Sequence, residues 1–523
     1  MKCENFIALF EKSLKENTKK AAFIEYHGDS VTYEVLAKRI NAYHNHWREI
    51  GLSKGDKIAI CGKNSCRWAE LYLAIVSGGY VAVLFPTDLP FDSYTRLLSF
   101  SDCRCLYCDD DLLSFAKTNK KIGIEFVYNI RSTIFSLESK KPSLVNLEFA
   151  KVSPEDLCTI LFTTGSTGFP KGCMLSVRNI SFGLETHDHP FAADEDNYVN
   201  LFLPFYHIFG LTGMLILPVC FGAQSIILTQ PPTPQNICSI LQRYKPLFIS
   251  VVPFIIKKLI EYIYKCPIEE IILEGEKQGS FKEIRDKFVK ELGGNIQVIY
   301  SGGTAMPPDV ESFLCKKIQF PCISGYGLSE TGCITQVSLS QSFRSCGTIH
   351  PDCHVRILSN NPHSVPGEIQ VFGDNVFLGY YKNDTATRSA FTSDKWFHTG
   401  DLGVFDEYGF LYIVGRCKDI IITSNGENIY PGDIEYELNL NPYIKESLLT
   451  KKEDKLHAII VIDRNQVKID NISDIEVLRQ IEISIAKANN LLPGFSFISS
   501  YSLRNEFLER TEKGELKRMF FFE

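Results

Sequence analysis

The stretch Thr163–Gly172, TTGSTGFPKG, decides how the rest of the chain is interpreted. It follows an apolar run, Leu157–Phe162, that has the length and flanking residues of a buried strand. Its glycines allow the backbone to approach a ligand closely, and successive amide groups in such a loop can surround an anion. Lys171 adds a positive charge, so we expect a polyphosphate-binding loop, although the Walker pattern GxxxxGK[ST] is absent. A polar surface turn is the alternative, but it needs neither so many hydroxyls nor the Pro-Lys-Gly close.

Strand and helix patterns alternate before this loop. Val31–Ile50 has apolar residues at helical spacing and is followed by a glycine, where a helix would end. Asp56–Cys61 and Tyr80–Leu84 have the composition of strands, and Trp68–Val76 between them has that of a helix. Parallel α/β units are therefore expected, and residues 1–151 should form a first layered subdomain.

Further strand-to-turn segments follow the loop. Gln297–Thr304, QVIYSGGT, runs into a Gly-Gly turn, and Ile323–Gly332, ISGYGLSETG, carries a carboxylate at its tip. Because ligands of open α/β sheets bind beyond the carboxyl ends of the strands, these turns predict a nucleotide cleft beside the phosphate loop. Gly367–Asn383 alternates apolar and polar residues between glycines, which predicts a small antiparallel β unit.

The composition narrows the class of protein. The chain has 523 residues, 45% hydrophobic content and a net charge of −7, which suits several large cores and argues against nucleic acid or an anionic membrane as the partner. Residues 1–20 lack the apolar core of a secretory signal and predict an amphipathic helix. Glycine and proline interrupt the most apolar stretch, Ile208–Ala223, so no membrane span is expected. The 17 scattered cysteines then favour a reduced, cytoplasmic setting.

Two groups of possible metal ligands have simpler interpretations. They are Cys103, Cys105 and Cys108, with Asp109 or Asp110 beside them, and the His187–His189 segment. Zinc sites usually combine two ligand pairs across a longer loop, and no second pair accompanies the cysteines. We favour the interpretation that the cysteines are small residues around a short strand and that the histidines lie in a polar loop.

The chain resembles the adenylate-forming enzymes: acyl- and aryl-CoA synthetases, firefly luciferase and the adenylation domains of peptide synthetases. Beside the phosphate loop, it has SGGT, YGLSETG, HTGD, GRxKD and a C-terminal TxxG in family order. The resemblance covers nearly the whole chain and is greatest to a fatty acyl-CoA ligase. It implies an α/β fold: a large N-terminal domain of layered α/β subdomains plus a small β unit, residues 1–415, then a small mobile α+β C-terminal domain, residues 416–523.

The resemblance assigns nucleotide roles to these motifs. Lys171 and the loop would bind the ATP phosphates, the Gly303–Thr304 backbone would meet the adenine edge, and Tyr326 would stack on its face. Glu330 would hold Mg²⁺, which prefers oxygen ligands. The ATP-binding residues so implied are Thr163, Thr164, Gly165, Ser166, Thr167, Gly168, Lys171, Gly302, Gly303, Thr304, Tyr326, Gly327, Ser329, Glu330, Asp401 and Arg416.

Other positions receive separate roles from the same resemblance. Asp401 would accept both ribose hydroxyls, and Arg416, which keeps its charge, would bridge ribose and phosphate. His207, in LPFYHIFG, would lie near the carboxylate of the acid, although a lone histidine is often structural. Lys418 would be the hinge between the domains, and Gly426 would lie against the pantetheine arm of CoA.

One position departs from the family pattern. The family ends with a Thr-x-x-Gly-Lys element whose lysine reaches the acyl carboxylate and the α-phosphate, but here Glu515 takes the place of that lysine. Lys513 and Lys517 flank it by two residues each, and residues two apart in an extended segment share a face. We expect Lys517 to serve as the catalytic cation, since Lys513 precedes the flexible Gly514. Slow adenylation, or loss of catalysis, are the alternatives.

The implied activity is ATP-dependent activation of a carboxylic acid, with ATP, Mg²⁺ and CoA as cofactors. The acid would form an acyl-AMP with release of pyrophosphate, and the acyl group would pass to the thiol of CoA. An acyl-AMP ligase that loads a carrier protein is one alternative, and a nucleotide- or acyl-binding protein without efficient catalysis is another. Peptide-synthetase domains carry an Asp near the His207 position to hold an amino group, and none follows here.

The expected wall of the acid pocket is apolar. Its segments, Phe205–Leu211, Val252–Ile255 and Cys322–Tyr326, contain no Asp, Glu, Lys or Arg. Burying an unpaired charge against such a wall is unfavourable, so the sequence favours an acid with a neutral tail, such as a fatty acid.

Overall fold

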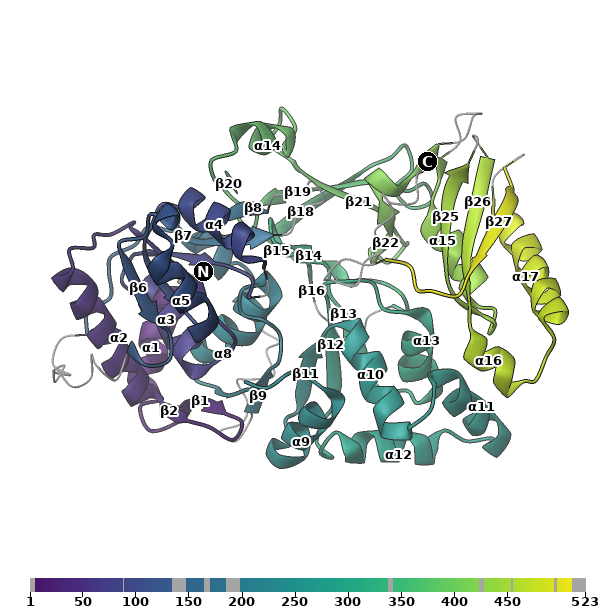
Figure 1. The fold of residues 1–523 in the computed structure, drawn as a ribbon, viewed down its shortest axis with the longest axis horizontal. Helices are drawn as coiled ribbons and strands as arrows, with labels where there is room; N and C mark the ends of the chain where they lie inside the picture. Colours follow the sequence, from purple (N-terminus) through teal and green to yellow (C-terminus); the bar gives the residue numbers. More distant parts are fainter. Residues whose placement is uncertain are drawn as a thin grey trace. The chain divides into compact units, whose positions relative to one another are not determined.

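A sheet of seven strands organises the N-terminal part of the chain (Figure 1). Its order is β20-β8-β7-β4-β3-β5-β6, and the pairs among β7, β4, β3, β5 and β6 are parallel, whereas β8 pairs antiparallel with β7 and with β20. The strands are β3 Lys57–Cys61, β4 Val81–Leu84, β5 Cys103–Cys108, β6 Phe126–Asn129, β7 Leu157–Thr163, β8 Lys171–Ser176 and β20 Gly379–Tyr380. The predicted parallel α/β arrangement is confirmed.

Helices cover both faces of this sheet, as parallel strands require. They are α1 Phe6–Glu16, α2 Tyr33–Glu49, α3 Cys66–Ser77, α4 Phe91–Phe100 and α5 Asp110–Thr118. Along β4, Ala82 and Leu84 pack into the cluster that contains α1, α2 and α3, whereas Val81 and Val83 pack into the cluster with α4 and α5. The side chain of Ser65 accepts a hydrogen bond from the backbone of Trp68 and caps α3 at its start.

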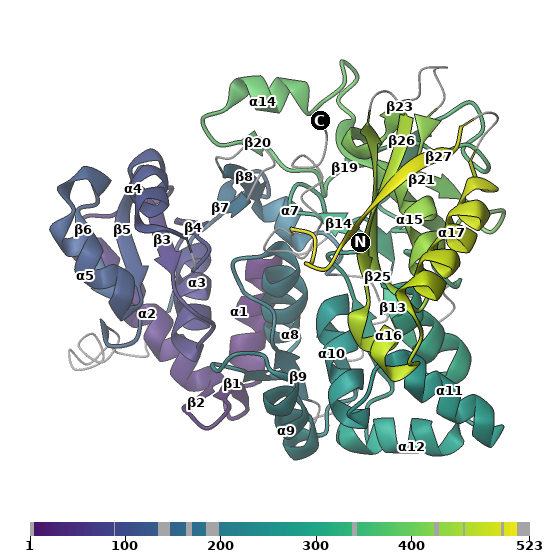
Figure 2. The same cartoon turned by 45° about the vertical axis from the view of Figure 1, so that its right-hand side comes forward.

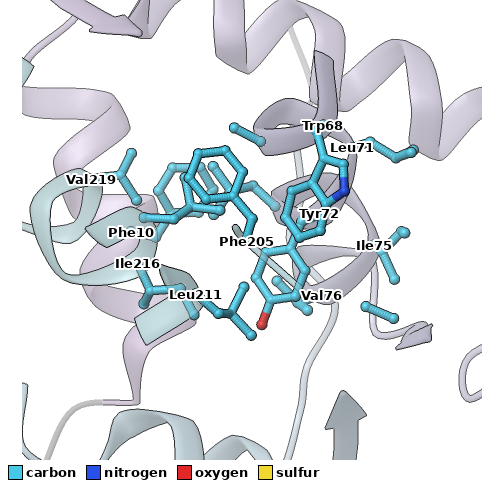
Figure 3. Packing of buried hydrophobic residues seen from close by; sticks show 14 of the residues in the cluster. Phe10, Trp68, Leu71, Tyr72, Ile75, Val76, Phe205, Leu211, Ile216 and Val219 are labelled. Carbon is cyan, nitrogen blue, oxygen red and sulfur yellow. The ribbon is translucent and has the colours of Figure 1, made fainter. Parts of the chain in front are cut away.

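The largest core joins distant segments through aromatic packing. Phe205 is fully buried, and its ring lies 5.2 Å from that of Trp68, which stacks on Tyr72 at 5.8 Å between ring centroids. Figure 3 shows Phe205 among side chains of α1, of α3 and of residues 211–219, which follow Phe205 in the chain. The backbone of Phe205 also donates to Asn64 and Asn64 donates to the Leu203 carbonyl, so the chain before His207 is fixed on both sides.

A network of charges is buried between α2 and α3. The Glu70 side chain is fully buried and accepts hydrogen bonds from Arg39, at 2.8 Å, and from Arg67, at 2.9 and 3.0 Å. Arg67 also pairs with Asp29 at 3.1 Å. One carboxylate therefore compensates two largely buried guanidinium groups.

Two further sheets complete the large N-terminal region. One has the order β2-β1-β10-β9, with β1 Ala21–Glu25, β2 Ser30–Thr32, β9 Tyr198–Leu201 and β10 Gln224–Ile227. The other is parallel, with β11 Phe248–Val251, β12 Val298–Ser301 and β13 Cys322–Ser324 in that order. Figure 1 shows helices gathered around these three strands: α9 Pro234–Tyr244, α10 Pro253–Tyr264, α11 Ile268–Gln278, α12 Lys282–Glu291 and α13 Pro308–Glu311.

Shorter elements connect these layers. They are the helices α7 Val177–Ser181, α8 Leu217–Cys220 and α14 Asp384–Ser389, the π-helices η4 Phe209–Ile216 and η5 Ser312–Lys317, and the 3₁₀-helices η1 Lys120–Ile122 and η6 Cys417–Asp419. Among the short strands, β14 Gly327–Leu328 pairs with β15 Gly332–Cys333, and β16 Thr335–Gln336 pairs with β17 Thr348–Ile349.

The segment expected to be one small β unit is divided between two sheets. β19, Gly367–Gly373, lies in a four-stranded sheet of order β18-β19-β21-β22, with β18 Cys353–Leu358, β21 Phe397–Phe405 and β22 Leu411–Arg416. The end of the same segment, β20, pairs with β8 instead. The backbone changes direction at both ends of the connection: Gly373, the last residue of β19, has a φ angle of 151°, and Gly379, the first residue of β20, has a φ angle of 129°.

The C-terminal sheet has three strands, β25 Ile444–Lys452, β26 Lys455–Ile462 and β27 Ile498–Arg504. Helices α15 Pro431–Asn439 and α17 Asp474–Asn489 pack against Leu456, Ala458 and Ile460 of β26, and Figure 2 shows both helices beside the strands. The hairpin β23 Ile421–Ile422 with β24 Asn428–Ile429 precedes them, and α16 Arg464–Ile469 joins β26 to α17. This is the expected α+β organisation.

This computed structural model describes residues 5–87, 89–133, 147–163, 170–184, 198–336, 342–422, 428–452, 455–492 and 496–509. Outside them lie Thr164–Gly168, the His187–His189 segment, Gly426, Lys513, Glu515 and Lys517. The chain divides into two compact units, Met1–His354 with Val371–Phe397, and Val355–Gln370 with His398–Glu523. The boundary expected after Gly415 stays a prediction. No helix within the described ranges is long and apolar enough to cross a membrane.

Replacing Glu70 with Gln should lower the free energy of unfolding by about 3–5 kcal/mol, because the two largely buried guanidinium groups would lose the buried anion that they share. Urea denaturation of the purified protein measures the change. The matched control is Glu34→Gln, which removes an exposed pair with Lys38 and should change stability by less than about 1 kcal/mol. Equal losses in the two variants would contradict the structural role given to Glu70.

Candidate active site

The hairpin of β7 and β8 holds both ends of the predicted phosphate loop. Its last register pair joins Thr163 to Lys171, and the Thr163 hydroxyl donates to the Lys171 carbonyl at 3.3 Å. Thr164–Gly168 lie outside the described residues, so their assigned contacts stay predictions. Since β7 ends at the carboxyl edge of a parallel sheet, the loop begins where ligands of such sheets bind.

A tight turn presents Ser329 and Glu330. It joins β14 to β15, and the Leu328 backbone donates to the Thr331 hydroxyl at 3.2 Å. A side chain at Gly327 would lie 2.1 Å from the Gly332 carbonyl oxygen, so the close approach of the two strands requires glycine at position 327. The Glu330 side chain is half-buried at the tip of this turn.

Glu330 and Lys171 both contact Tyr380, a residue that the sequence analysis did not select. The hydroxyl of Tyr380 donates to Glu330 Oε1 at 2.9 Å, and Lys171 Nζ lies 4.9 Å from the centre of the Tyr380 ring. A tyrosine after a glycine at the end of a predicted β unit has no distinctive local pattern, so only the pairing of β20 with β8 reveals it.

The ends of β12 and β13 adjoin each other. The Gly325 backbone donates to the Ser301 carbonyl at 2.8 Å, and Gly303 has a φ of 87°, which favours glycine. Gly303 and Thr304 are exposed, whereas Tyr326 is 9% exposed and its backbone donates to the Thr335 hydroxyl. These positions border one edge of the three-stranded sheet, as predicted for a nucleotide cleft, but their roles remain predictions.

His207 lies two residues before the start of the π-helix η4. Its backbone donates to the Pro204 carbonyl at 3.1 Å, and its ring lies 4.5 Å from the ring of Tyr206. Two residues later, Phe209 packs beside Gly302, where an added Cβ would meet the ring at 3.4 Å. The role of His207 near the acid stays a prediction.

The second compact unit pairs the two predicted ribose ligands. Arg416 Nε lies 2.9 Å from Asp401 Oδ1, because the two residues are directly opposite each other in the β21–β22 ladder. Asp401 is 3% exposed, and its backbone donates to the Thr399 hydroxyl. Lys418 is exposed in η6, directly after β22, and its hinge role stays a prediction, as do the roles of Gly426 and Lys517.

The three clustered cysteines do not converge on one point. Cys105 packs into the core on one face of β5, whereas Cys103 and Cys108 pack into the core on the other. Burial raises the pKa of the Cys105 thiol to about 12, which keeps it protonated near neutral pH. Among the described residues, no group of three or more His, Cys, Asp or Glu side chains could hold a metal ion.

Comparison with known proteins gives the family. The sequence model of the family described as AMP-binding enzyme matches residues 10–381, and that of the AMP-binding enzyme C-terminal domain matches residues 418–523. The chain belongs to the AMP-binding enzyme family. The predicted superfamily and α/β fold class are therefore confirmed.

Relatives and solved structures agree with this membership. A 2-succinylbenzoate–CoA ligase from Bacillus velezensis is 28% identical and covers 92% of both chains. Fatty acyl-CoA synthetase A from Dictyostelium discoideum is 26% identical over 82% of this chain and 71% of its own. ATP-bound MatB from Rhodopseudomonas palustris has a TM-score of 0.82 at 24% identity, with 99% of this chain and 98% of that chain covered. The last similarity concerns the fold alone.

Replacing Asp401 with Ala should raise the KM for ATP by about 10- to 100-fold and change kcat much less. Hydrogen bonds from ribose hydroxyls to a carboxylate would be lost equally in the ground and transition states. Steady-state kinetics measure this difference, and thermal unfolding checks that the variant is folded. A folded variant with an unchanged KM for ATP would contradict the ribose assignment.

Proposed function

We propose that the protein is an AMP-forming acyl- or aryl-CoA ligase. The proposal rests on the contacts that Tyr380 makes with Glu330 and with Lys171, the residue at the end of the predicted phosphate loop. A cation beside the loop and a carboxylate that can hold a divalent ion are what a nucleoside triphosphate requires. Membership of the AMP-binding enzyme family, across both parts of the chain, supports the same reaction class.

The first half-reaction activates the acid. A carboxylate oxygen attacks the α-phosphorus of ATP, the bond from that phosphorus to the bridging oxygen breaks, and pyrophosphate leaves. The protein contributes position and charge: Lys171 neutralises phosphate oxygens, and the Asp401–Arg416 pair binds the ribose and the adjacent phosphate. Glu330 fits Mg²⁺, because its half-buried carboxylate retains oxygen lone pairs besides the one that Tyr380 uses, and Mg²⁺ would neutralise phosphate charge.

The second half-reaction transfers the acyl group to CoA. The sulfur of CoA attacks the acyl carbon, AMP leaves with the electron pair of the broken mixed-anhydride bond, and the thiol proton is released. Rotation of the C-terminal region about Lys418, which is exposed in η6, would bring Gly426 to the pantetheine arm. Transfer to a carrier protein would use the same residues with a different acceptor.

The acid that we propose has an apolar body and a single carboxylate. Phe209, beside Gly302, and Val252, beside Gly303, contribute apolar surface at the expected pocket. The wall segments contain no Lys or Arg to pair with a second carboxylate, such as that of 2-succinylbenzoate. Monocarboxylic fatty or aromatic acids therefore suit this chain better than a dicarboxylate.

Incubation with ATP, Mg²⁺, CoA and a panel of acids tests this function. We expect AMP and a thioester to form at least about 10-fold faster with a fatty acid or benzoate than with 2-succinylbenzoate, since an unpaired buried charge weakens binding by several kcal/mol. Mass spectrometry identifies the thioester and any acyl-AMP. Acyl-AMP without thioester would favour the carrier-protein alternative, and neither product with any acid would contradict the ligase function.

The departure at Glu515 calls for a separate test of the first half-reaction. Pyrophosphate exchange should fall by about 100-fold in Lys517→Ala, because one lost electrostatic contact to the reacting groups typically has that effect. Lys513→Ala is the matched control and should retain most exchange, and Glu515→Lys should equal or exceed the wild type. Exchange that appears only in Glu515→Lys would instead support the nucleotide-binding alternative.

A further inference from the structure

We propose that Tyr380 is a positioning residue that orients the Glu330 carboxylate for a divalent cation and the Lys171 ammonium for phosphate. The proposal rests on the nucleotide-binding function proposed above and adds a residue to it. Two contacts carry it, the 2.9 Å hydrogen bond to Glu330 Oε1 and the placement of Lys171 Nζ at 4.9 Å from the ring centre.

Tyr380 is itself held firmly. It is 8% exposed and pairs with Cys173 in the ladder between β20 and β8, so its backbone is part of the seven-stranded sheet. Its backbone N–H donates to the Thr387 hydroxyl at 2.9 Å, and its ring meets that of Phe377 edge-on at 4.9 Å. A residue fixed in this way can restrict the mobile side chains that it contacts.

The same short segment also fixes the backbone beneath Glu330. The Phe377 N–H donates to the Glu330 carbonyl at 2.8 Å, and the Asn375 side-chain amide donates to the Thr331 carbonyl at 3.1 Å. Residues 375–380 therefore hold both the main chain and the carboxylate of Glu330. Few other arrangements of Glu330 are compatible with these contacts.

The chemistry of the phenol suits this task. The Tyr380 hydroxyl donates to the Glu330 carboxylate, and a phenol is an uncharged donor. A neutral donor orients the carboxylate without cancelling its charge, which leaves oxygen lone pairs for a cation. The electron-rich ring face attracts the Lys171 ammonium at the same time, so one residue contacts both charged groups.

The test compares Tyr380→Phe with Tyr381→Phe. Tyr381 is a matched control: it is also 8% exposed, and its hydroxyl also donates to a carboxylate, that of Asp102 at 2.8 Å. The measurement is ATP binding by calorimetry across a range of Mg²⁺ concentrations, which does not depend on turnover. We expect Tyr380→Phe to raise the Mg²⁺ concentration for half-maximal enhancement by about 10-fold, as loss of a group that orients a metal ligand typically does. Tyr381→Phe should leave it within about 2-fold, since the hydroxyl that it removes bonds Asp102 instead of Glu330.

Two further variants separate this proposal from the function on which it rests. Glu330→Gln should itself raise the Mg²⁺ requirement, and adding Tyr380→Phe to it should have no further effect, because the phenol acts through the carboxylate. An unchanged Mg²⁺ requirement in Glu330→Gln would refute the metal role of Glu330. A normal requirement in Tyr380→Phe, or additive effects in the double variant, would overturn the positioning role while leaving the metal role intact.

The ring is tested separately from the hydroxyl. Tyr380→Leu removes the aromatic face beside Lys171, and ATP affinity without Mg²⁺ should fall by about 2- to 5-fold, the effect of a partly exposed cation–aromatic contact. Tyr380→Phe keeps the ring and should bind ATP without Mg²⁺ as the wild type does. Equal affinities in the Leu and Phe variants, with matching thermal unfolding, would contradict the role of the ring.

Discussion

The antiparallel pairing of β8 with β7 is the constraint on which the proposed active site depends. The strands β4, β3, β5 and β6 run parallel to β7, so the carboxyl ends of these strands form one edge. Only a strand that turns back can return a side chain to that edge, and β8 does so with Lys171 opposite Thr163. The pairing of β20 with the other side of β8 then brings Tyr380 from more than two hundred residues downstream to the same place.

Three carboxylates illustrate how differently this fold uses negative charge. Glu70 is fully buried and is compensated by two guanidinium groups, which makes it part of the scaffold. Asp401 is also buried, but Arg416, which pairs with it across the β21–β22 ladder, is 37% exposed, so the pair can still reach a ligand. Glu330 is half-buried and receives a hydrogen bond from a neutral phenol, which preserves its charge for a cation. The balance of burial and partner charge separates structural from functional acids.

The two compact units divide the proposed chemistry between them. Lys171, Glu330 and the β12–β13 edge belong to the first unit, whereas Asp401, Arg416 and Lys418 belong to the second. The family models also divide the chain, with matches that end at residue 381 and resume at residue 418.

By itself the sequence determined the local elements and the family. The alternation around β3, α3 and β4, the strand before the phosphate loop and the Gly-bounded turn at Glu330 were all predictable, because periodicity and glycine chemistry act within a few residues. The order of the motifs identified the family by resemblance, and the nucleotide chemistry was what that resemblance implied. Only the tertiary structure decided that Gly367–Asn383 divides between two sheets, that Asp401 pairs with Arg416, and that Tyr380 joins Lys171 to Glu330. Which strands become neighbours, and which side chains of distant segments come into contact, depends on how the whole chain packs. A local sequence pattern therefore does not predict these partners.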